Sequence, residues 1–98
     1  MAHRSATKSE VERFDKMRDL GCIVCLNEKG IYTPPAIHHI DGQTKEGCHL
    51  LTIPLCQWHH QYKTAGEVSR HGDGRKAFEK AYGTEQELLE QVNNALGY

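Results

Sequence analysis

The sequence lacks an apolar run close to the roughly 20 residues that span a bilayer, so no membrane-spanning helix is expected. Its first residues, Met-Ala-His-Arg-Ser, contain no apolar stretch of the kind found in secretory signal peptides. Neither charge predominates, because 12 Lys and Arg face 13 Asp and Glu and give a net charge of -1. This balance excludes a strongly basic nucleic-acid coat but allows a local basic face. We therefore expect a protein of the reducing cytoplasm with no membrane partner.

The chain is rich in potential metal ligands, with seven His and four Cys in 98 residues. Two of the cysteines, Cys22 and Cys25, form a Cys-x2-Cys pair, and Cys56 and His59 form a later Cys-x2-His pair. Together these four side chains supply the nitrogen and sulfur ligands of a tetrahedral structural zinc. Two disulfides would leave the histidine grouping unexplained and do not suit a reducing compartment. A bound zinc ion would also stabilise a domain too small for a large apolar core.

The hydrophobic pattern predicts an α+β domain, with helices at both ends and two strands and a short helix between them. We expect a flexible tail over residues 1–8 and a single domain over residues 9–98. A capping box of Ser9 and Glu12 predicts the start of the first helix, and Gly21 its end. Thr84 and Glu87 form a second capping box before the last helix. The remaining expected elements are a tight knuckle at residues 22–25, a loop at 26–35, strands at 36–40 and 50–53, the second ended by a proline, and helices at 56–65 and 75–82.

Three further histidines, His38, His39 and His60, fall within the predicted strand–strand–helix unit. A second metal ion with an open coordination position is a natural interpretation of this grouping. Adjacent residues on a regular strand point to opposite faces, so His38 and His39 can share one site only where the strand bends or ends.

The motifs Cys-x2-Cys, His-His-Ile-Asp-Gly and Pro-Leu-Cys-x2-His-His resemble those of the HNH, or ββα-metal, endonuclease superfamily. The closer resemblance is to the RecA-dependent nucleases, the recombination-enhancement nucleases of temperate phages, and it extends from about Phe14 to Thr84. It implies a small zinc-stabilised ββα-metal core with flanking N- and C-terminal helices. It also implies a DNA endonuclease directed by RecA filaments, in the cytoplasm of a bacterial or phage-infected cell.

The resemblance implies a role for each residue that matches the motifs. His38 and His60 stand at catalytic-metal positions, His39 stands at the position of the general base, and His71 is a candidate to complete or flank the metal site. The structural zinc positions are matched by Cys22, Cys25, Cys56 and His59.

One position departs from the superfamily pattern. The middle Asn that gives the superfamily its name falls near Leu51, which cannot form the same hydrogen bonds. His49 and Thr52 are the neighbouring residues that could replace it, although His49 is otherwise expected to be solvated.

Hydrolysis of a phosphodiester requires an activated water molecule and a cation near the phosphate. A neutral imidazole such as that of His39 is a suitable base at cellular pH. Magnesium is the expected ion in cells, and manganese, nickel or zinc would also suit histidine ligands. A basic group close to the histidines would hold the DNA backbone without reading bases: Lys63, Arg70, Arg75 and Lys76.

The main alternative is a non-catalytic zinc module that binds DNA or a protein partner. A nuclease with strong sequence preference is disfavoured, because no separate base-reading segment is apparent.

Overall fold

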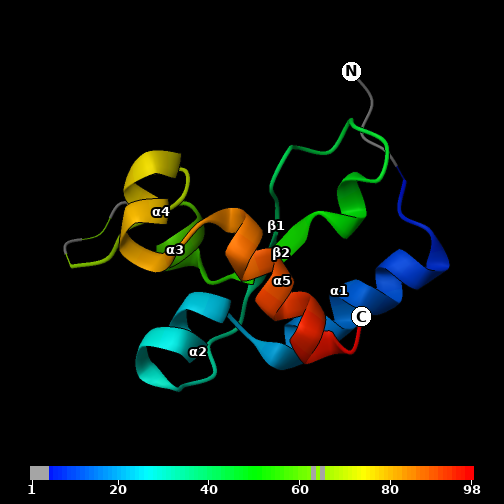
Figure 1. The fold of residues 1–98 in the computed structure, drawn as a ribbon, viewed down its shortest axis with the longest axis horizontal. Helices are drawn as coiled ribbons and strands as arrows, with labels where there is room; N and C mark the ends of the chain where they lie inside the picture. The colour runs from blue at the N-terminus through cyan, green and yellow to red at the C-terminus, as the bar shows by residue number, and fades with distance from the viewer. Residues whose placement is uncertain (1–4, 63, 65) are drawn as a thin grey trace.

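A computed structural model describes residues 5–62, 64 and 66–98 of the chain. Helices surround a small central sheet (Figure 1). The elements, in chain order, are α1 (Lys8–Leu20), α2 (Ile23–Lys29), β1 (Ala36–His39), a 3-10 turn (Cys48–Leu50), β2 (Thr52–Leu55), α3 (Gln57–His60), α4 (Arg75–Tyr82) and α5 (Glu85–Leu96). None of the helices in the described part of the chain has the length and apolarity needed to cross a bilayer. The fold is of the expected α+β class.

The sheet consists of two antiparallel strands, in which His38 lies opposite Ile53 and His39 opposite Thr52. Strand β2 is buried along its whole length, and α1, α2 and α5 pack against it. The second strand was predicted at residues 50–53 and ended by Pro54, but Pro54 lies inside β2 and pairs with Ile37. A two-stranded sheet tolerates this proline because each strand has one edge without a ladder partner.

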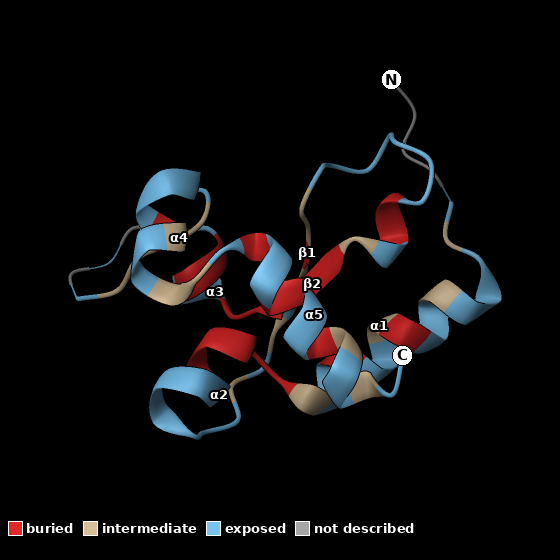
Figure 2. Cartoon of the chain, in the orientation of Figure 1, coloured by how far each residue is buried: buried red, intermediate tan, exposed pale blue. Residues whose placement is uncertain are grey.

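The core lies between the sheet and the inner faces of the helices (Figure 2). Its apolar members come from both ends of the chain and from the sheet: Met17, Ile23, Val24, Ile53, Leu55, Phe78, Leu88, Leu89 and Val92. The last helix thereby packs beside the first, and both helices contact β2, the strand that pairs with the histidine-bearing β1.

Helix α1 begins earlier than the predicted capping box of Ser9 and Glu12. Its N-cap is Thr7, whose hydroxyl accepts from the Glu10 backbone N–H at 3.3 Å, while the Glu10 carboxylate accepts from the Thr7 N–H at 2.8 Å. The pairs Ser9 and Glu12 and Thr7 and Glu10 both have the spacing of a capping box, and the pair Thr7 and Glu10 forms both hydrogen bonds and caps the helix. The Thr84 box at the start of α5 is as predicted.

Gly21 ends α1 as predicted and turns the chain into Cys22. Its φ is +85°, a conformation that side chains with a Cβ rarely adopt. A Cβ at this position would lie 2.7 Å from a ring carbon of Tyr32. Glycine is therefore required here by both backbone conformation and space.

Two segments differ from their predicted secondary structure. Residues 23–29 form α2 rather than a knuckle and a loop, with Cys22 as the N-cap. The helix predicted at residues 56–65 ends at His60, because the returning chain bonds to its last carbonyls. The N–H of Arg70 donates to the carbonyl of His59 at 2.8 Å, and that of His71 donates to the carbonyl of His60 at 2.9 Å.

A buried arginine, which sequence periodicity did not single out, joins α1 to β2 and α5. Arg13 is 2% exposed and donates to Thr52 Oγ1 at 3.1 Å, to the Thr52 carbonyl at 2.9 Å and to Asn93 Oδ1 at 2.7 Å. Burial lowers the pKa of its guanidinium.

We expect Arg13→Met to lower the free energy of unfolding by about 2–4 kcal/mol, because the Thr52 carbonyl and the Asn93 amide lose a charged donor. The measurement is urea denaturation of the zinc-loaded protein. Arg18→Met on the same helix is the matched control, since the Arg18 side chain forms an exposed pair with Asp15 and its loss should change stability by less than about 1 kcal/mol. Equal losses in the two variants would contradict the role given to Arg13.

Candidate functional site

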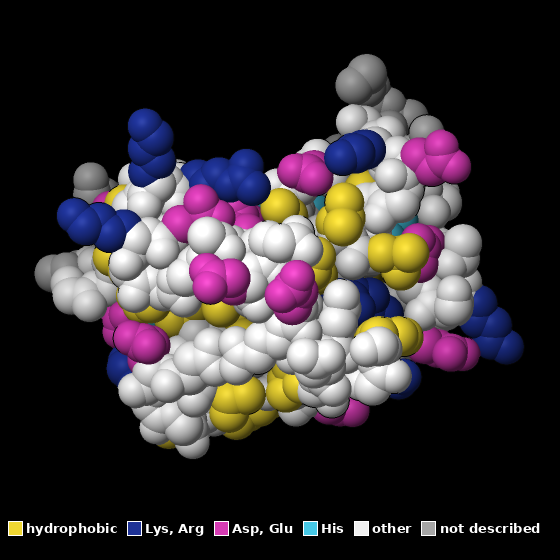
Figure 3. Space-filling view, in the orientation of Figure 1, with side chains coloured by type: hydrophobic (Ala, Val, Ile, Leu, Met, Phe, Trp, Pro, Cys, Tyr) yellow, Lys and Arg dark blue, Asp and Glu magenta, His cyan; other side chains and the backbone are white. Residues whose placement is uncertain are grey.

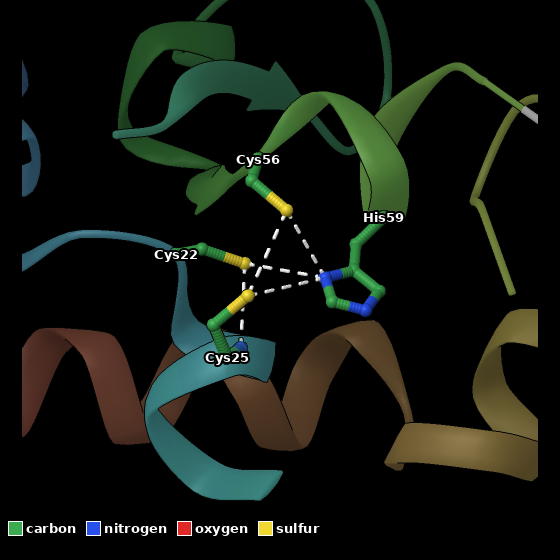
Figure 4. A group of neighbouring side chains, drawn as sticks. All are labelled: Cys22, Cys25, Cys56 and His59. Carbon is green, nitrogen blue, oxygen red and sulfur yellow. Dashed lines mark hydrogen bonds between the residues drawn. The ribbon is translucent and has the colours of Figure 1, made fainter. Parts of the chain in front are cut away.

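The predicted zinc ligands Cys22, Cys25, Cys56 and His59 converge in the structure, and all four are buried (Figure 4). His59 Nδ1 lies 3.6 Å from the sulfurs of Cys22 and Cys25 and 3.2 Å from that of Cys56. The sulfurs of Cys25 and Cys56 are 3.7 Å apart. Tetrahedral zinc, with bonds of about 2.3 Å to sulfur and about 2.0 Å to nitrogen, requires separations of about 3.8 Å and about 3.5 Å. The cluster could therefore hold a structural zinc ion.

The disulfide alternative does not fit the structure. All four cysteines are free, and the 3.7 Å between Cys25 and Cys56 is far longer than a bond of about 2.05 Å. Burial raises the pKa of the Cys22 thiol to about 12 and also raises that of Cys56. A zinc ion binds thiolates, so binding here would displace protons. Cys48 is buried and lies outside the cluster.

A carboxylate that the sequence did not single out orients His59. Glu67 Oε2 accepts from His59 Nε2 at 2.8 Å, which leaves Nδ1 with its lone pair toward the three sulfurs. Glu67 is itself held by Lys29 at 2.9 Å and by the Tyr82 hydroxyl at 3.2 Å. The bonds from Lys29 and His59 lower the pKa of Glu67 to about 2, so this carboxylate stays ionised.

A second cluster consists of His38, His60 and His71, whose candidate ligand atoms all lie within 4.8 Å of one another. The ring centroids are 5.1 Å apart for His38 and His60 and 4.9 Å apart for His60 and His71. Burial and the neighbouring imidazoles lower the pKa of His60 to about 4, and burial also lowers that of His71. Both rings are therefore neutral at pH 7 and have a nitrogen lone pair to offer a metal ion.

His39 points to the other side of the strand, as its position next to His38 predicts. His39 Nε2 lies 2.9 Å from His49 Nδ1, and the ring of Phe14 packs edge-on against both imidazoles. His49 is only 6% exposed, so the expectation of a solvated side chain was wrong. Of the two candidates for the missing Asn, His49 bonds to the His39 ring, whereas Thr52 lies opposite His39 in the sheet and donates its hydroxyl to the His49 carbonyl at 3.0 Å.

The four histidines His38, His39, His60 and His71 meet at one cavity of about 340 Å³. His39 reaches it although it lies outside the three-histidine cluster, because the cavity extends around the end of β1 to Gly42 and Gln43. The arrangement places a group of imidazole nitrogen donors and a separate imidazole around one open space.

A family model described as "Recombination enhancement, RecA-dependent nuclease" matches residues 6–97. The match spans both clusters and nearly the whole chain. The chain belongs to this family of RecA-dependent nucleases. A nuclease of this family acts on DNA, so a DNA substrate follows from the membership.

In this RecA-dependent nuclease family member, Lys and Arg side chains gather around α4, and acidic side chains lie over α5 (Figure 3). Arg70 and Arg75, two of the predicted DNA-backbone ligands, both bind Glu85, at 2.8 Å and 2.9 Å. Arg75 also lies 3.9 Å from Glu79. These acidic partners offset much of the positive charge that the sequence places here. Lys76 is exposed on α4, and Lys63 lies outside the described residues.

Proposed function

We propose that this protein is a metal-dependent DNA endonuclease that hydrolyses phosphodiester bonds. The observation that carries the proposal is the cavity in which a three-histidine cluster and a fourth imidazole meet in a member of a nuclease family. The cluster suits a metal ion, and the fourth imidazole suits a base. Structural zinc or DNA binding alone does not require this second group of histidines.

The candidate ligands of the catalytic ion are His38, His60 and His71. A divalent ion bound there would stabilise negative charge on the phosphate during cleavage. Three imidazole nitrogen donors suit zinc, manganese or nickel, whereas magnesium prefers oxygen ligands. We therefore expect transition metals to support activity at lower concentrations than magnesium.

His39 is the proposed general base. Its bond to His49 involves Nε2, so a proton removed from water would be taken up at Nδ1. This requires the tautomer in which His39 donates to His49, with the lone pair of His49 Nδ1 as the acceptor. Packing of Phe14 against both rings limits their rotation.

The local order of elements supports an HNH, or ββα-metal, assignment. Two antiparallel strands, β1 and β2, are followed directly by the short helix α3, and the candidate ligands lie on β1, on α3 and on the segment between α3 and α4. In this assignment Cys22, Cys25, Cys56 and His59 hold the structural zinc, and Lys63, Arg70, Arg75 and Lys76 contact the DNA backbone. Contacts of this kind weaken as salt concentration rises and carry no base specificity.

The experiment that tests the proposal is a plasmid-nicking assay on zinc-loaded protein, with each of magnesium, manganese and nickel added in turn. RecA and ATP are present or absent, together with a single-stranded oligonucleotide homologous to the plasmid. We expect metal-dependent nicking that is strongest when a RecA filament has paired with the plasmid. Equal nicking with and without RecA would remove RecA direction from the proposal. No nicking with any ion would instead favour the non-catalytic zinc module.

A further inference from the structure

Glu85 is a carboxylate with no exposed surface that lies next to the histidine cluster. It is the first residue of α5, directly after the N-cap Thr84. Its Oε2 accepts from His38 Nε2 at 2.7 Å, and its Oε1 accepts from Arg70 Nε at 2.8 Å. The same Oε1 forms an ion pair with Arg75 Nε at 2.9 Å. One buried side chain thus joins β1, the segment before α4 and α4 itself to the start of α5.

The bonds around Glu85 outweigh the cost of burying its charge. Burial acts to raise its pKa, but the hydrogen bonds from His38 and Arg70 hold the pKa below its usual range. The residue is therefore an anion at neutral pH. The 2.7 Å between His38 Nε2 and Glu85 Oε2 is a hydrogen-bond distance, and with Nε2 as the donor the lone pair of His38 is on Nδ1.

We propose that Glu85 is a positioning residue of the histidine site: it fixes the ring and the tautomer of His38 for metal binding and holds Arg70 beside that ring. The inference rests on the metal-dependent function proposed above. Glu85 contacts His38 in the same way that Glu67 contacts His59 of the cysteine cluster. In both places a carboxylate binds Nε2 and leaves Nδ1 for the metal ion.

Arg70 connects Glu85 to a second member of the histidine cluster. Arg70 is only 17% exposed and directly precedes His71 in the chain. Its backbone N–H bonds to the carbonyl of His59, so both its main chain and its side chain are held. Glu85 therefore limits the movement of two cluster members, His38 directly and His71 through Arg70.

The test compares Glu85→Gln with Glu79→Gln in zinc-loaded protein. Glu79 makes a matched control, because it belongs to the same network and contacts Arg75 and the Glu85 N–H but not His38. Cobalt is titrated into each protein, and binding is followed by visible absorption. Cobalt bound by thiolates would give a strong thiolate-to-cobalt absorption band. The weakness of that band therefore verifies that the ion enters the histidine site rather than the cysteine cluster.

We expect Glu85→Gln to bind cobalt about 10–100-fold more weakly than the unchanged protein, the usual effect of removing such a carboxylate. Glu79→Gln should bind nearly as tightly as the unchanged protein. Equal affinity in the Glu85 variant and the unchanged protein, or equal weakening in both variants, would overturn the inference.

Nitrogen NMR of the unchanged protein supplies a readout that does not depend on the folding of any variant. His38 is expected to carry its hydrogen on Nε2, and a hydrogen on Nδ1 instead would also overturn the inference. Failure of the proposed function gives a different result, namely a protein that binds cobalt in this way but cleaves no DNA. Absence of cobalt binding in the unchanged protein would overturn both.

Discussion

DNA cleavage by the His39→Ala protein is expected to be about 10²–10⁴-fold slower than that of the unchanged protein, the usual loss when a general base is removed. The substitution removes the imidazole of a residue that lines the cavity and lies outside the three-histidine cluster. It leaves all four ligands of the cysteine cluster in place. Zinc content, the far-UV circular dichroism spectrum and cobalt affinity should therefore be nearly unchanged.

The matched control for this prediction is Gln43→Ala, which also removes a polar side chain from the wall of the same cavity. An amide cannot act as a base at neutral pH, so this variant should lose less than about tenfold in rate. Both proteins are compared in single-turnover nicking at saturating DNA, so that differences in binding do not enter the rate. A His39→Ala protein that cleaves as fast as Gln43→Ala would show that the base lies elsewhere.

The cysteine cluster was predictable because short sequence spacings identify its metal ligands. A Cys-x2-Cys pair and a Cys-x2-His pair each bring two ligands to one side of a turn, and only one partner pair was available for each. The fold then had only to bring the two pairs together. The helix end at Gly21 and the Thr84 capping box were predictable for the same reason, since each follows from a local rule.

The carboxylates that orient the histidines could not be predicted in this way. Glu67 and Glu85 are two of 13 acidic residues, and no spacing rule connects Glu85 to His38, which lies 47 positions earlier. The same holds for the bond between His39 and His49, which depends on how the loop between β1 and β2 folds back. Tertiary packing selects these partners after the local elements have formed.

The basic residues of this region show that positive charges close together in the sequence need not form an unpaired basic surface in the fold. Residues 60–82 contain Lys63, Arg70, Arg75, Lys76 and Lys80, which predicts a face for phosphate. Two of these side chains, Arg70 and Arg75, are turned toward Glu85 and Glu79 in the fold. The contribution of Arg70 and Arg75 to DNA binding stays a prediction. The structure adds that both side chains pair with the buried carboxylate of Glu85.

The Cys56→Ser protein is expected to lose zinc and, with it, its folded structure. Cys56 is the N-cap of α3, and its sulfur is the closest of the three to His59. Zinc binding by small domains contributes about 10–16 kcal/mol at pH 7, as much as the entire stability of a typical domain. Metal content by native mass spectrometry and far-UV circular dichroism measure both losses.

Cys48→Ser is the matched control, because Cys48 is also buried and free but lies outside the cluster. It should keep one zinc ion per chain and lose only about 1–3 kcal/mol, the cost of burying a hydroxyl in place of a thiol. Equal zinc content and equal stability in the two variants would contradict the assignment of Cys56 as a ligand.

Loss of the structural zinc should also disable the histidine site, whereas emptying the histidine site should leave the fold intact. His59 and His60 are neighbours on α3, one in each cluster, and the backbone of Arg70 and His71 is hydrogen-bonded to the carbonyls of both. A weak chelator is therefore expected to stop cleavage with no change in circular dichroism, and added metal should restore it. A strong chelator at acidic pH, where protons compete for the thiols, should remove zinc and unfold the chain. If the weak chelator unfolds the chain at the same concentration that stops cleavage, the two sites bind their metal ions with similar affinity, which would contradict this prediction.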